Sequence, residues 1–124
     1  MHKSRLGVLV IDCKTDDPGD AAAFWSAALG YPISDHQPDD RYVALESPEG
    51  ELRALVQRVD HDSRIHLDVE TDDKEAEARR LEALGAKRIA EIKGWIVMEA
   101  PSGHRFCLVG PQRSDFKERA RSWD

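Results

Sequence analysis

The hydrophobic and polar positions of the chain follow one pattern twice. Apolar, β-branched runs at 6–13 and 65–69 predict strands, and each run is followed by Asp residues that can cap a helix. An Ala-rich segment then places apolar residues three or four positions apart, which is typical of a helix with one buried face. Gly30 and Gly85 stand where a left-handed helix C-cap belongs. The pattern therefore predicts a strand followed by a helix in each half of the chain.

Three further short strands are predicted after each helix. They cover 31–34, 41–46 and 52–58 in the first half, and 86–92, 95–99 and 105–109 in the second half. The segments 47–50 and 100–103 each contain Pro and Gly, which favour tight turns, so they are expected to join the last two strands of each half as hairpins. The predicted organisation is β-α-β-β-β, twice, with a short polar linker at 59–64.

The two halves also match each other residue by residue. Segment 10–17 aligns with segment 66–73, a shift of 56 positions, and both carry Asp, Thr and Asp-Asp at the same places. A Leu-Gly pair at the end of each helix and a Pro-x-Gly turn near each last hairpin recur at similar shifts. Three ordered matches indicate a duplicated module. Coincidence between common turn sequences is the alternative.

Composition narrows the class of protein. A chain of 124 residues fits one domain. Its 24 acidic and 18 basic residues give a net charge of −6, which argues against a nucleic-acid or anionic-membrane partner. No stretch approaches the roughly 18 apolar residues of a membrane span, and the first apolar run lacks a signal-peptide cleavage site. We therefore expect a cytoplasmic protein in which Cys13 and Cys107 are free thiols.

The tail at 112–124 lies outside the repeat. Three apolar residues fall on one face of a predicted amphipathic helix: Phe116, Ala120 and Trp123. Asp115 and Glu118 are spaced like the two residues of a capping box. We expect this helical tail to cover an edge of the sheet or to dock on a partner subunit, and a role in gating a ligand is the alternative.

A duplicated βαβββ module whose first helix carries Phe24 and Trp25, both expected in the core, resembles the vicinal oxygen chelate superfamily. That superfamily includes glyoxalase I, bleomycin-resistance proteins and extradiol dioxygenases, and the chain is most similar to its glyoxalase-like branch. The residues that carry the resemblance are 11–13, 23–31, 57–59, 64–69, 84–86, 95–98 and 106–109. The resemblance implies one α+β domain over residues 1–111. Its modules, at about 5–59 and 64–111, would form a cupped, barrel-like mixed sheet with the helices outside.

The resemblance also implies where a metal would bind. Catalytic members hold a divalent metal in the cup through ligands on the first and last strands of each module, and the metal acts as a Lewis acid. The corresponding positions here are Val10, His66, Cys107 and Ala54, or Gln57 if the strand register shifts. Metal-dependent members carry Glu where this chain has Cys107. We therefore expect no catalytic metal and no other cofactor, with His66 and Cys107 as the ligands if a metal does bind.

Polar side chains remain on the strand face that this fold would turn into the cup. Because side chains alternate along a strand, Asp68 shares a face with His66, and Asp12 is its repeat counterpart. A His beside a carboxylate can act as acid or base, so His66 with Asp68 or Asp12 is the candidate site for binding or protonating a polar ligand. A structural hydrogen-bonded pair is the alternative. Trp95 could stack on a flat ligand, with core packing as its alternative.

The leading interpretation is a glyoxalase-like protein that binds a small organic molecule in the cup without a catalytic metal. The residues expected to contact the ligand are Asp12, Gln57, His66, Trp95 and Cys107. The second interpretation is a lyase or isomerase with His66 and Asp68 as catalytic residues, and the third is a metal-dependent glyoxalase or dioxygenase. A purely structural domain that binds a partner is the fourth interpretation. The sequence therefore does not decide whether the protein is an enzyme. Arg53 and Arg58 could meet an anionic ligand or form a solvated strand edge. Superfamily members commonly pair, so a homodimer is expected.

Overall fold

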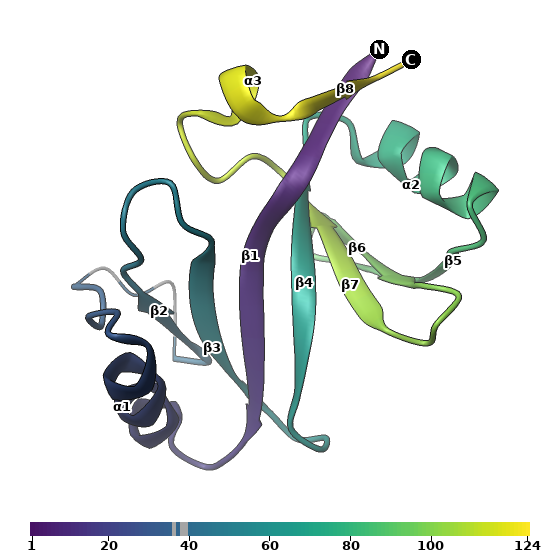
Figure 1. Ribbon diagram of the computed structural model, residues 1–124. Coiled ribbons are helices and arrows are strands. Elements are labelled where there is room, and N and C mark those ends of the chain that lie inside the picture. Colours follow the sequence, from purple (N-terminus) through teal and green to yellow (C-terminus); the bar gives the residue numbers. More distant parts are fainter. Residues whose placement is uncertain (36, 38–39) are drawn as a thin grey trace. The chain divides into compact units, whose positions relative to one another are not determined.

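The computed structural model describes the whole chain except residues 36 and 38–39 (Figure 1). Its described residues form two compact units. The first unit is Val8–His66, and the second unit combines Met1–Gly7 with Leu67–Asp124. Two strands, β1 (His2–Lys14) and β4 (Arg64–Thr71), contribute residues to both units. Among the described residues, no helix has the length and apolar character needed to cross a membrane.

The first unit is a small sheet with one helix. Its other elements are α1 (Pro18–Leu29), β2 (Tyr42–Leu45) and β3 (Arg53–Val59). The strand order is β2-β3-β1, with β3 parallel to β1 and antiparallel to β2. The predicted strand at 31–34 is reduced to one isolated bridge between Ile33 and Leu45.

The ends of the two long helices follow the sequence signals. The side chain of Asp17 accepts a hydrogen bond of 2.8 Å from the backbone N–H of Gly19, and Asp73 accepts one of 3.0 Å from Ala76. Both bonds satisfy helix N–H groups that lack a partner within the helix. Gly30 ends α1 with a φ of 74°, a left-handed conformation that a side chain would disfavour. Local chemistry therefore sets where these helices begin and where α1 ends.

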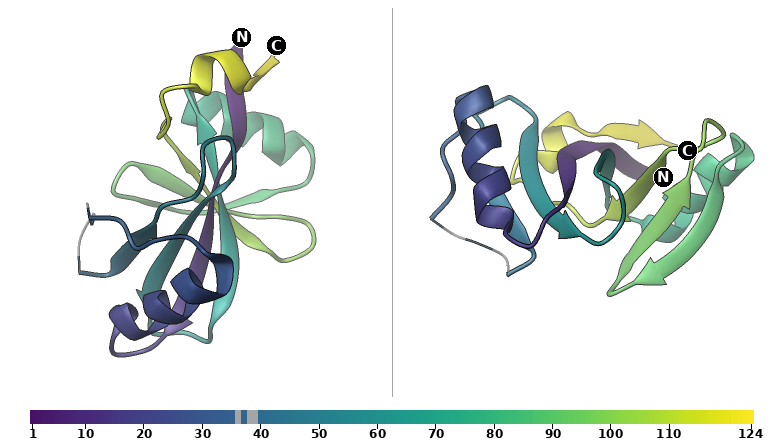
Figure 2. Two further views of the ribbon diagram at one scale, coloured as in Figure 1. Left: turned by 60° about the vertical axis from the view of Figure 1, so that its left-hand side comes forward. Right: turned by 90° about the horizontal axis from the view of Figure 1, so that it is seen from below.

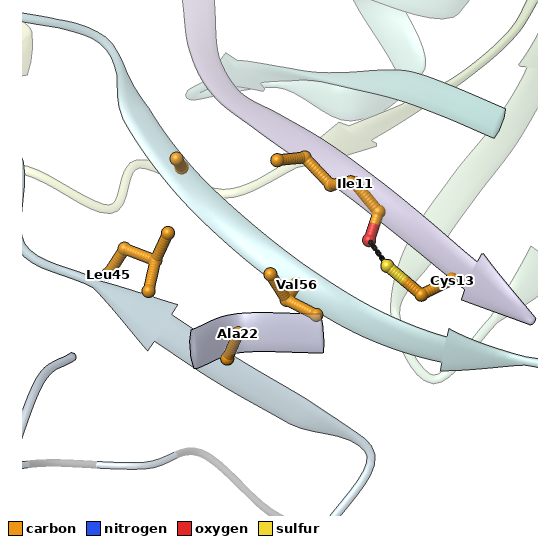
Figure 3. Close-up of a cluster of buried hydrophobic side chains, with 6 residues drawn as sticks. Ile11, Cys13, Ala22, Leu45 and Val56 are labelled. Carbon is orange, nitrogen blue, oxygen red and sulfur yellow. Dashed lines mark hydrogen bonds between the residues drawn. The ribbon is translucent and has the colours of Figure 1, made fainter. Parts of the chain in front are cut away.

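The core of the first unit lies between its sheet and α1. It contains Ile11, Cys13, Ala22, Leu45, Ala54 and Val56 (Figure 3). The Cys13 thiol also donates to the carbonyl oxygen of Ile11 at 3.5 Å. Trp25 packs against this core as expected. Phe24 does not: 63% of its surface is exposed, and its ring makes an edge-to-face contact with the Trp25 ring at 5.1 Å between centroids.

The second unit repeats the same plan. It contains part of β4 together with α2 (Lys74–Ala83), β5 (Lys87–Ile92), β6 (Trp95–Glu99) and β7 (Arg105–Val109). The order is β4-β7-β6-β5, with β7 parallel to β4 and antiparallel to β6. Its buried core, between sheet and α2, is formed by Ala78, Ile96, Met98 and Leu108. Both modules thus place the last strand parallel to the first, which confirms the predicted α+β repeat.

The predicted tail helix is wrong over most of its length. The helix α3 (Phe116–Arg119) has four residues and is followed by strand β8 (Arg121–Trp123), which pairs antiparallel with the start of β1, as both views of Figure 2 show. Ala120 takes a ψ of 150°, so the backbone leaves the helix there. Two contacts of Trp123 stabilise the strand conformation. Its indole N–H donates to Ser4 Oγ at 2.8 Å, and its ring stacks against the Arg80 guanidinium. The tail covers a strand edge, as the sequence suggested, but mainly with a strand.

The Asp115–Glu118 capping box does not form either. The carboxylate of Asp115 makes no hydrogen bond to the backbone of α3. It accepts a bond of 2.8 Å from the guanidinium of Arg5, which is a stronger donor than a backbone N–H. That ion pair lies within the second unit and ties the start of β1 to the tail.

Candidate functional site

A row of polar side chains crosses the sheet of the first unit on the face opposite α1. The residues Asp12, Gln57 and Tyr42 are register partners on β1, β3 and β2. Directly opposed residues share a face of the sheet, and their strand neighbours Ile11 and Val56 point the other way, into the core. We call Tyr42, Gln57, Asp12 and His66 the polar row.

The centre of the polar row is a close pair between Asp12 and His66. Asp12 Oδ2 lies 2.7 Å from His66 Nδ1, and only 2% of the Asp12 surface is exposed. Arg64 Nε lies 3.7 Å from the same oxygen. A carboxylate accepts only from a protonated nitrogen, so in the neutral imidazole the proton lies on Nδ1 and the lone pair on Nε2. Asp12 therefore sets both the orientation and the tautomer of His66.

The second oxygen of Asp12 is buried and has no hydrogen-bond partner among the residues that the structure describes. Buried polar atoms in folded proteins almost always have a partner, which can be another protein group, an ordered water or a ligand. A buried oxygen without a hydrogen-bond partner destabilises the fold by about 1–3 kcal/mol, and a charged oxygen by more. Oδ1 of Asp12 is thus an acceptor whose donor has to come from outside the described residues.

Gln57, rather than Ala54, occupies the last-strand position of the first module. Ala54 lies in the core under α1, on the face opposite the polar row. Gln57 pairs in register with Asp12, just as Cys107 pairs with Asp68 in the second unit. Its amide Nε2 donates to the hydroxyl of Tyr42 at 3.2 Å. The assignment to Ala54 is therefore wrong, because the two modules differ in the lengths of their last strands and turns.

The corresponding face of the second unit carries the remaining predicted residues. Asp68 and Cys107 are register partners on the parallel strands β4 and β7. Cys107 also pairs with Val97, which lies two residues along β6 from Trp95 and shares its face. The alternate β6 residues Ile96 and Met98 point into the core with α2. Asp68, Trp95 and Cys107 thus lie on the face of the sheet opposite α2.

The residues at the four expected metal positions do not match the donor set of catalytic superfamily members. Val10 has no ligand atom, and Gln57 offers a neutral amide that is hydrogen-bonded to Tyr42. His66 supplies an imidazole and Cys107 a thiol. A site for a hard divalent cation needs several carboxylate or imidazole donors, and this set contains one. The four positions thus hold one imidazole, one thiol, one amide and one aliphatic side chain.

Two residues of this site, Tyr42 and Arg64, were not predicted from the sequence. Tyr42 joins the polar row only through the antiparallel pairing of β2 with β3, and Arg64 reaches Asp12 from the first residue of β4. Tyr42 belongs to no motif, and Arg64 lies in segment 64–69, which carries the family resemblance but by itself gave Arg64 no role. Cys13, on the opposite face, has its pKa raised by burial and, secondarily, by the charge of Asp12, which makes it an unreactive core residue.

Sequence and structure comparisons agree on the class of protein. The two related βαβββ modules have the fold that is found in a solved member of the glyoxalase/bleomycin resistance protein/dioxygenase superfamily. The family model of the glyoxalase-like domain matches residues 8–109, so the chain belongs to the glyoxalase-like domain family. No curated protein matches the chain in sequence.

Several solved structures share the fold. Methylmalonyl-CoA epimerase from Mycobacterium tuberculosis is 18% identical over 87% of this chain and 88% of its own, with a TM-score of 0.66. A glyoxalase/bleomycin resistance protein/dioxygenase superfamily member from Vibrio splendidus is 18% identical over 85% of this chain and 98% of its own, with a TM-score of 0.52. Homoprotocatechuate 2,3-dioxygenase from B. fuscum is 18% identical, with a TM-score of 0.59, over 90% of this chain but 33% of the dioxygenase. At these identities the likeness concerns the fold.

Proposed function

We propose that this glyoxalase-like chain binds a small organic molecule against its polar row, without a catalytic metal. The observation that carries the proposal is the buried Asp12 carboxylate, whose Oδ2 pairs with His66 while Oδ1 has no partner among the described residues. A hydroxyl or an N–H of the ligand is the donor that we expect at Oδ1. Gln57 and Tyr42 extend the row with an amide and a hydroxyl group for the same ligand.

The metal-free part of the proposal rests on the identity of the residues. Val10 and Gln57 stand at two expected ligand positions and Cys107 at a third, so we propose that recognition comes from hydrogen bonds and packing. On the second unit, Asp68, Cys107 and Trp95 are the residues that we expect to take part, with Trp95 available for stacking. Elemental analysis of the purified protein tests this point, and a stoichiometric divalent ion would contradict it.

The binding proposal can be tested by thermal shift with a panel of hydroxy acids, catechols and acyl-CoA thioesters. A compound that binds only the folded state raises the melting temperature. We expect Asp12→Asn to weaken the binding of any such compound about tenfold, because the buried acceptor of the hydrogen bond loses its charge. The matched control is Asp62→Asn, since Asp62 lies in the same unit but its side chain is fully exposed. Equal binding by the wild type and Asp12→Asn would contradict the proposal.

A lyase or isomerase activity is the second candidate, favoured by the 2.7 Å contact between Asp12 and His66. A His held by a carboxylate is a common general base. Since two of the similar structures are methylmalonyl-CoA epimerases, we suggest incubating methylmalonyl-CoA with the protein in D2O and following deuterium uptake beside the carbonyl. Uptake that is lost in His66→Gln, with binding retained and His104→Gln unaffected, would favour the enzyme. If the wild type shows no deuterium uptake and His66→Gln only weakens binding, the result would favour a binding protein.

The remaining parts of the proposal concern partners and location. A homodimer in the cytoplasm is the arrangement that we expect, because superfamily members commonly pair. The net charge of −6 disfavours nucleic acid and anionic membranes as partners. Light scattering on the eluted protein tests the dimer directly, and a monomeric mass would contradict it.

A further inference from the structure

The guanidinium of Arg64 lies beside the polar row. Arg64 is the first residue of β4, two positions before His66, so the two side chains share a face of the strand. Nε of Arg64 lies 3.7 Å from Oδ2 of Asp12, which allows charge attraction but is too long for a hydrogen bond. No hydrogen bond joins this guanidinium to any residue that the structure describes, and 48% of the side chain is exposed. Its N–H donors are therefore available to a ligand.

An acceptor and a cationic donor thus lie close together in the first unit. The acceptor is Oδ1 of Asp12, which is buried and has no hydrogen-bond partner among the described residues. Because the two oxygens of a carboxylate are about 2.2 Å apart, Nε of Arg64 lies no more than about 6 Å from Oδ1. Hydrogen bonds of about 2.8 Å at each end leave a span that neighbouring groups of one small molecule can fill.

The charges of this pair restrict the ligand further. Oδ1 of Asp12 accepts only from an O–H or N–H group, and the guanidinium of Arg64 donates to an oxyanion, which it can bind through two oxygens. A ligand with positive charge alone would meet the repulsion of Arg64, and one with negative charge alone would meet that of Asp12. A ligand that carries a donor next to an oxyanion satisfies both side chains at once.

We infer that the site takes a small carboxylic acid with a hydroxyl or amino group on the carbon next to the carboxyl group. The hydroxyl or amino group donates to Oδ1 of Asp12, and the carboxylate binds the guanidinium of Arg64. The inference rests on the proposed function, because it names the class of ligand for the same site. Arg64 becomes the residue that selects an acid over the corresponding alcohol or ester.

Four probes of nearly equal size test the two contacts separately, each titrated into the full chain at constant ionic strength. Lactate and alanine carry both groups, propionate lacks the donor, and methyl lactate lacks the negative charge. Two-dimensional NMR of the backbone amides should show saturable shifts at 11–13 and 64–66 with lactate or alanine. Propionate and methyl lactate should each bind about tenfold more weakly, since each loses one hydrogen bond to a charged group.

The comparison of lactate with alanine distinguishes the two possible donors. Tighter binding of lactate assigns a hydroxyl group to Oδ1 of Asp12, and tighter binding of alanine assigns an ammonium group. Failure of both probes to give saturable shifts at 11–13 and 64–66 would overturn the inference. Propionate that binds as tightly as both of them would also overturn it, because no donor would then be needed.

A pair of variants tests the role of Arg64. Arg64→Gln should weaken the binding of lactate or alanine about tenfold and leave that of methyl lactate unchanged, because only the carboxylate contact is lost. The matched control is Arg58→Gln. Arg58 belongs to the same unit and is 35% exposed, but it follows Gln57 in β3 and so points to the opposite face. Equal losses for lactate and methyl lactate in Arg64→Gln would contradict the carboxylate contact. Dispersed amide spectra confirm that each variant is folded.

The same measurements separate this inference from the proposed function. A catechol or an acyl-CoA thioester could shift the amides at 11–13 in the wild type but not in Asp12→Asn, while lactate and alanine do not bind. That result would overturn the class of ligand and leave the proposed binding site in place. If no compound of the panel binds in a way that depends on Asp12, the proposed function fails, and the inference fails with it.

Discussion

Glu77 offers a direct test of the energetics of the second unit. It lies on α2 with 1% of its surface exposed, and its carboxylate accepts two bonds of 2.8 Å from the guanidinium of Arg80. The ring nitrogen Nε2 of His2 lies 2.7 Å from the same carboxylate. Burial by itself would raise the pKa of Glu77. The hydrogen bonds from Arg80, His2 and Ser4 outweigh burial and lower the pKa from 4.5 to about 2.

This lowered pKa sets the size and the direction of the expected effect. A fall from 4.5 to about 2 corresponds to about 3 kcal/mol of folding free energy. Because the pKa is lower in the folded state, this contribution is fully present above about pH 4.5 and is lost as the pH falls toward 2. Glu77→Gln keeps the shape of the side chain but leaves the charge of Arg80 facing a neutral amide. We therefore expect it to lower the free energy of unfolding by about 3 kcal/mol near neutral pH.

Urea unfolding of the wild type and Glu77→Gln at about pH 7 and about pH 3 measures both quantities. The gap between the two proteins should shrink to roughly half at the lower pH. Glu75→Gln is the matched control on the same helix, because Glu75 pairs with Arg88 at 2.8 Å but is 55% exposed, and it should change stability far less than Glu77→Gln does. Equal stability of wild type and Glu77→Gln near neutral pH, or a gap independent of pH, would refute the reasoning.

Two further predictions concern packing and reactivity. A Cβ added at Gly7 would collide with Cγ of the fully buried Glu70, so Gly7→Ala should lower the free energy of unfolding by about 1–3 kcal/mol in thermal melts. Gly110→Ala is the control, because a Cβ added at Gly110 would have no atom within 4 Å. Similar losses of stability in both variants would contradict the prediction. Burial, with the adjacent carboxylate second, raises the pKa of the Cys13 thiol. Cys13 should therefore react with Ellman's reagent more slowly than the partly exposed Cys107, and comparable rates would disprove this.

Much of the fold could be predicted because its signals are local. Asp17 and Gly30 mark the ends of α1 through contacts within a few residues, and Pro-Gly turns mark the last hairpins. The alternation of side chains placed Ile11 and Cys13 under the helix, where the structure has them. Each of these features depends on neighbours in the chain, so a single sequence contains the information needed to predict it.

The candidate site depended on contacts between residues far apart in the chain. Whether Ala54 or Gln57 faces Asp12 is set by the register of two parallel strands, and that register follows from long-range backbone pairing. The same is true of the contact between Asp12 and His66, because the sequence did not decide whether Asp12 or Asp68 is the carboxylate partner of His66. Only the tertiary structure could decide these contacts, because their partners lie more than 40 residues apart and no local propensity distinguishes one register from the next.

The tail and Phe24 show the same division between local and long-range effects. The spacing of Phe116 and Trp123 favours a helix, yet the residues at 121–123 gain backbone hydrogen bonds from β1, and Trp123 gains its contacts with Ser4 and Arg80. Those gains come from segments more than 40 residues away, so they override a local preference of a few tenths of a kcal/mol per residue. The amino-acid sequence alone thus determined the repeated modules and most helix ends. The tertiary structure decided which side chains meet, because strand pairing is a property of the whole fold.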